Sequence, residues 1–432
     1  MHFILFIFLF VQGCSVSKTT QPSGYTYING DPLPDAPELA PRGEYKVGVR
    51  TVQWVNKAQI DILKSKGGID PLYDRPLTAE IWYPAIVPEN ERETTAYDDY
   101  FGNPADSTRP LMPFYFAGRA LRNAKPDIKP IPFPLVIVSH GYPGSRVLLS
   151  YLCENLASKG YVVVAIDHTE STHADQKGFQ STLLNRAKDI LFVLNQVDTD
   201  SKSSENFLSG LTDANNTALI GYSMGGYGVL NAAGAGYSDK LAAFFTMMTQ
   251  GSKSINSRTT NDSAFKASYD SRIKAVVAFA PWGMQRGIWD AEGLKGLKAP
   301  TLFIAGDKDD VSGYEDGTKA IYNGAVNADR YLLTYENARH NVAPNPPPTQ
   351  SLKPGFPMSD YYHYAEPAWN ERRINNINQH FVTAFLGIHL LHQPYNKYLE
   401  IADSVKTKSW PGFKPRASVG LELVHAGKLS KP

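Results

Sequence analysis

The residue best suited to nucleophilic chemistry in this chain is a serine set between two glycines. Residues 221–225 read Gly-Tyr-Ser-Met-Gly, after an apolar strand pattern and before a helix-compatible run. Strand, sharp turn and helix form the context in which Gly-x-Ser-x-Gly exposes a nucleophile, here Ser223. The turn is so tight that side chains at Gly221 and Gly225 would clash. A glycine-rich turn without any catalytic role reads the same way, so the pattern needs support from other segments.

A serine hydroxyl needs a base within hydrogen-bond reach, and that base needs an orienting acid. In α/β-hydrolases the chain order is serine, acid, histidine, with the acid and the histidine each following a later strand. Here the apolar run 300–304 precedes aspartates within 307–310, and the run 330–335 precedes His340. The sequence therefore predicts a catalytic set of Ser223, an aspartate of that cluster, and His340.

Each member of this set has a plainer interpretation. The aspartate cluster could be a solvated loop or a cation site, although Val311 stands where a calcium loop needs its fifth-position ligand. A histidine by itself is more often a surface residue, and only its place in the expected loop favours catalysis. Because His and Cys show no metal-ligand spacing, we expect no metal site and no cofactor.

A tetrahedral intermediate also needs backbone donors for its oxyanion. One donor is the N–H after the nucleophile, which belongs to Met224, and the second comes from the loop after an earlier strand. Residues 139–144 follow the buried run 134–139 and fit that place. Pro143 has no N–H, so we choose the N–H of Tyr142 as the second donor.

Further segments indicate a family. They are 136–141 (Val-Ile-Val-Ser-His-Gly), 156–168 and 221–226, together with 47–51, 75–84 and 280–282. These segments resemble the platelet-activating-factor acetylhydrolase-like and dienelactone-hydrolase-like branch of the α/β-hydrolases, to which bacterial cutinases and poly(ethylene terephthalate) hydrolases are related. The resemblance covers roughly residues 45–390 and is most specific at the serine, acid and histidine segments.

The resemblance implies roles for particular residues. It assigns the acid to Asp310, ahead of Asp307 or Asp309. It implies that Trp282 flanks the acyl group and that the ring of Tyr142 touches substrate. Trp282 could instead be a packing residue at a strand end.

Two histidines near these segments, His140 and His168, are expected to hold loops rather than to react. One departure from the family matters for the chemistry. True dienelactone hydrolases use a cysteine nucleophile, whereas this chain has Ser223, so the family name does not define the reaction.

Apolar runs alternate with helical patterns along most of the chain. This alternation predicts an α/β-hydrolase fold, with a mostly parallel central sheet, helices on both faces and inserted loops. The expected strands are 47–55, 79–84, 134–139, 161–166, 218–220, 273–279, 300–304 and 330–335, and the clearest helices are 181–197 and 369–386.

The expected catalytic domain spans residues 43–394. It carries insertions near 97–132, which looks irregular, and near 235–271. The second insertion could form a lid, a pocket wall or only surface, and we favour the pocket wall. Residues 395–432 look like a polar, loop-like C-terminal tail.

The N-terminus reads as a targeting segment. An apolar run at 3–11 is too short to span a bilayer and fits the core of a signal peptide over 1–13. Cys14 would then be the lipidated first residue of a bacterial lipoprotein, and 14–42 a flexible tether. Ordinary secretion and a misread start are the alternatives. With Cys14 lipidated, Cys153 has no disulfide partner and is expected to be a buried thiol.

The chain has a net charge of +1 over 432 residues and no long basic run, which argues against nucleic acid as the main partner. We expect a monomeric enzyme that touches the membrane only through its lipid anchor. Its expected activity is a serine carboxylic-ester hydrolase for short acyl esters. Polyester or cutin-like substrates come second, and amides or thioesters third. The rival from another class is a surface-binding lipoprotein on an inactive hydrolase scaffold.

Overall fold

The computed structural model describes residues 27–401 and 410–429. The predicted signal peptide and Cys14 lie outside these residues. Among the helices within the described ranges, none is long and apolar enough to cross a membrane.

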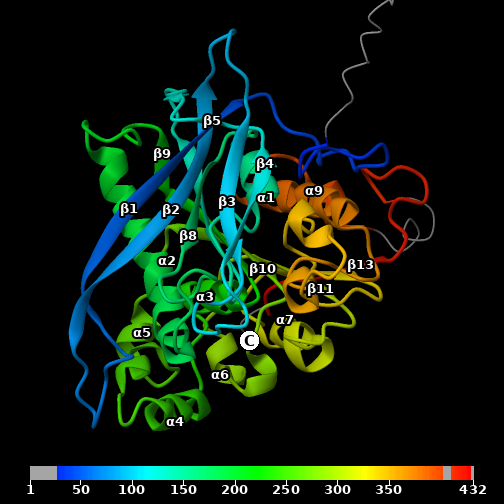
Figure 1. The fold of residues 1–432 in the computed structure, drawn as a ribbon. Helices are drawn as coiled ribbons and strands as arrows, with labels where there is room; N and C mark the ends of the chain where they lie inside the picture. Colours follow the sequence, from blue (N-terminus) through cyan, green and yellow to red (C-terminus); the bar gives the residue numbers. More distant parts are fainter. Residues whose placement is uncertain (1–26, 402–409, 430–432) are drawn as a thin grey trace, which may run out of the picture.

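A large mixed sheet forms the centre of the molecule (Figure 1). Its strand order is β13-β12-β11-β10-β9-β7-β8-β2-β1-β5, and the run from β12 to β8 is parallel throughout. The strands of this sheet are β1 (Lys46–Ile60), β2 (Leu72–Ile86), β5 (Leu121–Arg122), β6 (Lys125–Pro126), β7 (Phe133–Ser139), β8 (Val162–Asp167), β9 (Thr212–Tyr222), β10 (Ile273–Phe279), β11 (Thr301–Gly306), β12 (Arg330–Tyr335) and β13 (Leu421–Ala426).

Helices cover both faces of this sheet, as the sequence predicted. On one face α1 (Ser150–Ala157) and α9 (Glu371–Leu391) contribute to one apolar core. On the other face α2 (Phe179–Lys202) and α3 (Met224–Ala232) contribute to a second. Every residue of β7, β11 and β12 is buried, because a parallel strand between two helical layers has no face in water.

The first insertion is more regular than the sequence suggested. It contains a hairpin of β3 (Thr95–Phe101) and β4 (Met112–Gly118), which form a separate two-stranded sheet. Buried and exposed residues alternate along both strands, which is the pattern of a strand with one face packed. The expectation of an irregular segment over 97–132 is therefore wrong for these residues.

The second insertion is helical and lies at the lower end of the view in Figure 1. It consists of α4 (Asp239–Met248), η1 (Ser254–Arg258) and α5 (Ser263–Ala267). The remaining short helices are η2 (Met284–Arg286), α6 (Ala291–Leu294), η3 (Tyr314–Thr318), α7 (Lys319–Gly324), η4 (Thr349–Leu352), α8 (Met358–Tyr361) and η5 (Asn396–Tyr398).

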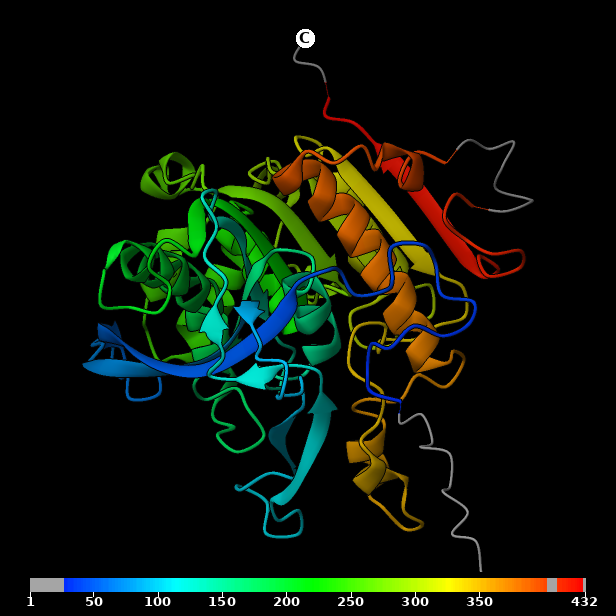
Figure 2. The same ribbon diagram turned by 90° about the horizontal axis from the view of Figure 1, so that it is seen from above.

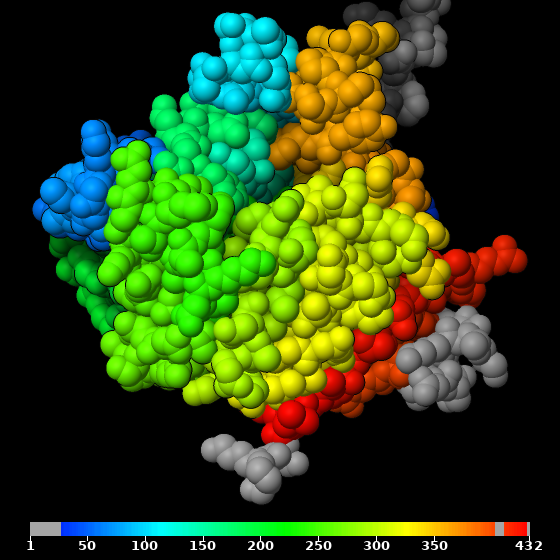
Figure 3. Space-filling view, turned by 90° about the horizontal axis from the view of Figure 1, so that it is seen from below, coloured from blue at the N-terminus to red at the C-terminus, as the bar shows by residue number. Residues whose placement is uncertain are grey.

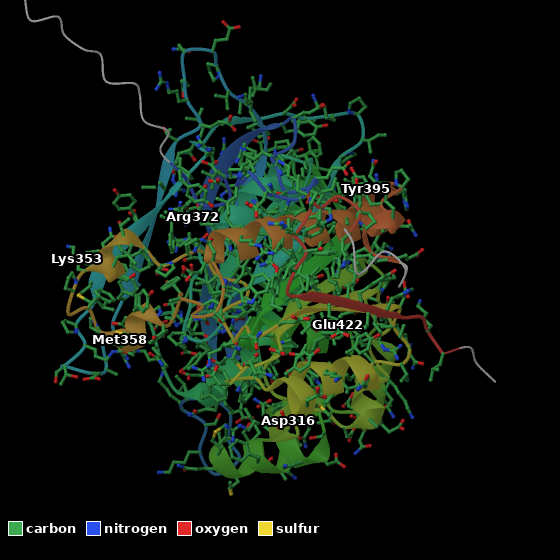
Figure 4. The ribbon with its side chains drawn as sticks, turned by 90° about the vertical axis from the view of Figure 1, so that its right-hand side faces the viewer. Asp316, Lys353, Met358, Arg372, Tyr395 and Glu422 are labelled. Carbon is green, nitrogen blue, oxygen red and sulfur yellow. The ribbon has the colours of Figure 1, made fainter. Side chains whose placement is uncertain are left out.

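The C-terminal segment completes the sheet instead of forming a loop-like tail. β13 pairs antiparallel with β12 and forms the outer edge beside it (Figure 2). Leu421 and Leu423 are buried, while Glu422, labelled on β13 in Figure 4, points away from the core. The expectation of a loop over 395–432 is wrong at this strand, where exposed Glu422 and His425 interrupt the apolar residues and hide the strand in the sequence.

The described part of the predicted tether is packed against α9. The Leu33 N–H donates to Asn376 Oδ1 at 2.8 Å, the Leu39 N–H donates to His380 Nδ1 at 3.2 Å, and Ala40 is fully buried. Residues 27–42 therefore belong to the folded domain, and its boundary lies before residue 43.

Candidate active site

The turn between β9 and α3 holds Ser223 in an unusual backbone conformation, with φ 53° and ψ −114°. Such angles are costly for a residue with a side chain, and they occur where the surrounding structure enforces them. A Cβ on Gly221 would lie 2.2 Å from the carbonyl oxygen of Gly225, and one on Gly225 would lie 1.9 Å from that of Ser139. The predicted steric need for both glycines is confirmed.

His340 follows β12 and reaches the serine directly. Its Nε2 lies 3.0 Å from Ser223 Oγ, and its Nδ1 lies 2.9 Å from Asp309 Oδ2. An ionised carboxylate can only accept, so Nδ1 carries the proton and Nε2 is free to accept from the serine hydroxyl. The three side chains, all buried, have the hydrogen-bond order of a nucleophile, base and orienting acid.

The acid beside His340 is Asp309, and the choice of Asp310 is wrong. The Asp309 side chain is fully buried, and its Oδ1 accepts from the N–H groups of Val311 and Ser312 at 2.9 and 2.8 Å. Asp310 is about half exposed and pairs with Arg339 at 3.2 Å. The turn after β11 sends neighbouring side chains in different directions, which consecutive aspartates in a sequence do not reveal.

The loop after β7 runs beside the nucleophile. A Cβ on Gly141 would lie 3.6 Å from Ser223 Cβ. The Gly141 carbonyl accepts from Arg186 Nη2 at 3.2 Å and from His140 Nδ1 at 2.6 Å. In a trans peptide the C=O and N–H point in opposite directions, so these bonds fix the direction of the Tyr142 N–H.

The other predicted donor, the Met224 N–H, lies at the first residue of α3. The first N–H groups of a helix have no partner within that helix, so this group is available to a ligand. Tyr142 and Met224 thus lie on the two segments that flank Ser223, the loop after β7 and the start of α3.

Arg186 on α2 is a residue that the sequence analysis missed. It is buried at 1% exposure, and besides Gly141 its guanidinium donates to the His140 carbonyl and to Ser171 Oγ. The sequence did contain a signal for Arg186, because it is a charged residue on the apolar stripe of a predicted helix. Charged residues stay buried only when they are well hydrogen-bonded, so such a position indicates a structural or functional role.

A second Ser–His–Asp chain lies beneath the same loop. His168 Nδ1 donates to Asp189 Oδ2 and its Nε2 accepts from Ser139 Oγ, both at 2.9 Å. Arg75 closes the network through Asp189 at 2.9 Å, and burial lowers the pKa of His168 to about 3. All of these groups are buried away from solvent, which agrees with the loop-holding role predicted for His168 and, beside it, His140.

An aromatic wall stands next to Ser223. The rings of Tyr142 and Phe179 meet edge to face at 5.2 Å, and those of Phe179 and Trp282 at 5.4 Å. The Trp282 N–H donates to the Ser223 carbonyl at 3.1 Å. Both residues expected to touch substrate, Tyr142 and Trp282, therefore lie at the site. Phe179, the first residue of α2, packs between them. It was not predicted as a site residue because it belongs to no recognisable motif.

Tyr222 and Asn341, which the sequence did not mark as site residues, hold the loop that carries His340. The Tyr222 ring lies 5.2 Å from the His340 ring, and its hydroxyl donates to Asn341 Oδ1 at 2.9 Å. Asn341 Nδ2 in turn donates to the carbonyls of Tyr362 and Ala365 at 2.7 and 2.9 Å. The residue before the nucleophile and the residue after the base thus fix the histidine loop.

A cavity of about 410 Å³ opens beyond the aromatic wall. Its lining residues are Phe179, Leu183, Lys240, Leu241, Phe244, Trp282, Arg286 and Ile288. The three residues from α4 belong to the second insertion, which Figure 3 shows as green surface adjoining the yellow-green residues after β10. Residues of α4 therefore form part of the wall of this cavity, and the role of residues 235–271 as a substrate-pocket wall stays a prediction.

Across residues 27–401 and 410–429, no group of three or more His, Cys, Asp and Glu side chains is placed to hold a metal ion. Cys153 is a free, buried thiol, and burial raises its pKa well above the usual value. A protonated buried thiol is a poor nucleophile, so Cys153 is not suited to that role.

Comparison with known proteins places this site in a family. The family model described as "PETase: PET hydrolase-like" matches residues 131–261 and 260–353, which together exceed half of the chain. Cutinase est1 of Thermobifida alba is 28% identical over 211 residues, 49% of this chain and 54% of that protein. Bis(hydroxyethyl) terephthalate hydrolase of Streptomyces coelicolor is 24% identical over 214 residues, 49% of this chain and 52% of that protein.

The chain thus spans about half the length of the curated relatives it matches. A solved ferulic acid esterase from Streptomyces cinnamoneus has a TM-score of 0.54 at 19% identity, covering 88% of this chain and 99% of that one. This likeness supports the fold alone, and with the parallel sheet and two helical layers it shows an α/β-hydrolase fold. By the family match, the chain belongs to the PET hydrolase-like family.

Proposed function

We propose that the protein is a serine carboxylic-ester hydrolase that works through an acyl-enzyme intermediate. The observation that carries this proposal is the continuous hydrogen-bond chain from Ser223 Oγ through His340 to Asp309. Trp282, whose backbone N–H donates to the Ser223 carbonyl, also lines a cavity of about 410 Å³, which offers space for part of an ester substrate. The names of its relatives, cutinases and a terephthalate ester hydrolase, support the same reaction class.

Acylation begins when Ser223 Oγ attacks the ester carbonyl carbon and His340 Nε2 takes the hydroxyl proton. Asp309 keeps the imidazole in the required tautomer and stabilises the imidazolium that forms. The N–H groups of Tyr142 and Met224 bind the oxyanion. His340 then gives its proton to the alcohol, which leaves as the acyl-enzyme forms.

Deacylation repeats the same steps with water as the nucleophile. His340 accepts a proton from water, the hydroxide adds to the acyl carbonyl, and the same two N–H groups hold the oxyanion. Collapse of the second tetrahedral intermediate returns the proton to Ser223 and releases the acid. No step requires a cofactor.

Short acyl esters are the first substrate class, because the Tyr142–Phe179–Trp282 wall bounds the space beside Ser223. A polyester or cutin-like polymer is the second candidate. The family match and an exposed aromatic side chain at the cavity, Phe244 at 48% exposure, favour it. An amorphous polyester film incubated with the enzyme would release soluble acids under the second proposal and none under the first.

The test of the reaction class is hydrolysis of p-nitrophenyl esters with acyl chains of about two to twelve carbons, by wild type and Ser223→Ala. We expect activity on the short chains and a loss of at least about 1,000-fold in kcat for the variant. Equal rates for the two proteins would contradict the proposal, because Ser223 would then not be the nucleophile.

A further inference from the structure

The cavity beyond Trp282 combines an apolar lining with two basic side chains. Lys240 comes from α4 and Arg286 from η2, and both line the cavity together with Phe179 and Trp282. A Cβ on Gly287 would lie 3.0 Å from Lys240 Nζ, so the ammonium sits against the residue next to Arg286. Two cationic residues thus line this cavity, and the Lys240 ammonium lies beside the backbone next to Arg286.

Neither basic side chain has an ion-pair partner among the residues that the structure describes. The two nearest acidic residues in sequence are engaged elsewhere. Both carboxylate oxygens of Asp239 accept from Asn261 Nδ2, at 2.7 and 2.9 Å. Asp290 accepts from the N–H of Gly293 at 2.7 Å and caps α6. Neither of these two carboxylates is therefore paired with Lys240 or Arg286.

The two elements that carry these charges are fixed to each other. Ser238, the N-cap of α4, donates its hydroxyl to the Gly287 carbonyl at 2.6 Å, and its N–H donates to the Ile288 carbonyl at 2.9 Å. The same hydroxyl accepts from the N–H of Leu241 at 3.2 Å. These bonds keep the start of α4 against the turn after η2. The backbone segments that carry Lys240 and Arg286 are therefore held together.

Trp282 belongs both to the cavity and to the surroundings of the nucleophile. The side chain of Trp282 lines the cavity, and its N–H donates to the Ser223 carbonyl at 3.1 Å. Apolar and aromatic walls suit a ring or a short hydrocarbon chain, while the cationic side suits a carboxylate at the far end.

From this arrangement we propose that the cavity is an anion-selective acyl subsite. It takes the acid part of half-esters of compact dicarboxylic acids, with the free carboxylate held by Lys240 and Arg286 and the scissile ester at Ser223. This inference rests on the proposed ester hydrolase function and names its substrate class.

The test compares two methyl esters of nearly equal shape. Monomethyl terephthalate carries a carboxylate para to the ester, and methyl 4-carbamoylbenzoate carries a neutral amide there. The ratio of their kcat/KM values, each divided by its alkaline hydrolysis rate, measures the preference for charge. We expect wild type to favour the carboxylate roughly tenfold, as two exposed cations can supply, and the preference to shrink with added salt.

Variants assign the preference to the cavity. In the double variant Lys240→Met with Arg286→Met, the preference for the carboxylate over the amide ester is expected to disappear, because both cations are removed. The matched control is Lys266→Met, which removes the same charge from an exposed residue of the same insertion that lines a different cavity. That control should retain the preference.

The failures of this inference and of the proposed function are distinguishable. Turnover of both esters without preference in wild type, or a preference that survives the double variant, would overturn the subsite and leave the hydrolase. Activity on p-nitrophenyl acetate with none on either aromatic ester would also overturn the subsite alone. Absence of activity on every ester would overturn both.

Discussion

At the scale of single residues, the site depends on which of two adjacent aspartates faces the base. Asp309 is buried against His340, whereas Asp310 is exposed and paired with Arg339. Because the carboxylate that holds the tautomer contributes far more to the rate than an exposed neighbour, two isosteric substitutions separate the two assignments.

Asp309→Asn should lower kcat by about 10,000-fold, while Asp310→Asn should change it by no more than a few-fold. The measurement is steady-state hydrolysis of p-nitrophenyl acetate by both variants, with thermal unfolding to confirm that each is folded. The reverse ranking would restore Asp310 as the acid and contradict the geometry.

The sequence predicted Ser223 and His340 because each is tied to a local constraint. The serine stands in a turn that only glycines permit on either side, and the histidine follows a recognisable buried strand. The acid could not be assigned so well, since Asp307, Asp309 and Asp310 share one loop and differ only in the direction that the backbone gives each side chain.

At the scale of elements, α2 positions the oxyanion loop through Arg186. The guanidinium binds the carbonyls of His140 and Gly141, and the second of these belongs to the peptide whose N–H, that of Tyr142, is the proposed oxyanion donor. Loss of these bonds frees that peptide to rotate, which weakens the transition state more than substrate binding.

Arg186→Met should therefore lower kcat on the order of 100-fold with KM nearly unchanged, and Arg186→Lys should recover part of the loss. The matched control is Arg330→Met. Arg330 is also a buried arginine whose guanidinium donates to carbonyls, of Tyr322 and Gly427 among others, but it lies at the start of β12. A similar fall in kcat for both variants would show that general destabilisation, and not the loop, is responsible.

The central strands could be predicted because strands buried on both faces read as unbroken apolar runs. The hairpin β3–β4 and the edge strand β13 could not, since each is buried on one face only, and polar residues interrupt the apolar sequence of β3 and β13. Contacts such as those of residues 27–42 with α9 join parts of the chain more than 300 residues apart. No local sequence pattern predicts contacts of this kind.

At the scale of the whole molecule, stability depends on pH through a buried carboxyl in the first insertion. Asp99 accepts from Ser145 Oγ at 2.6 Å, which ties the hairpin to the segment after the oxyanion loop. Burial raises the pKa of Asp99 from 3.8 to about 7. Between these values the folded protein binds more protons than the unfolded chain, so this carboxyl makes the protein less stable as pH rises through that window.

Asp99→Asn removes this dependence because an amide does not titrate. The difference in unfolding free energy, wild type minus variant, should fall between about pH 4 and pH 7, by up to about 1.4 kcal/mol per pH unit, and then level off. Urea unfolding at pH 4.5, 6.0 and 7.5 would measure it. A difference that is constant across these conditions would mean that Asp99 ionises normally in the fold.

The claim on which the rest depends is that Ser223 is an activated nucleophile. The most direct test is covalent labelling with a fluorophosphonate probe, followed by mass spectrometry of the peptides. We expect one label per chain, on Ser223, formed rapidly by wild type, much more slowly by His340→Ala and not at that position by Ser223→Ala. A folded wild-type protein that takes no label, or takes it elsewhere, would show that Ser223 is not activated and would favour a binding protein on a hydrolase scaffold.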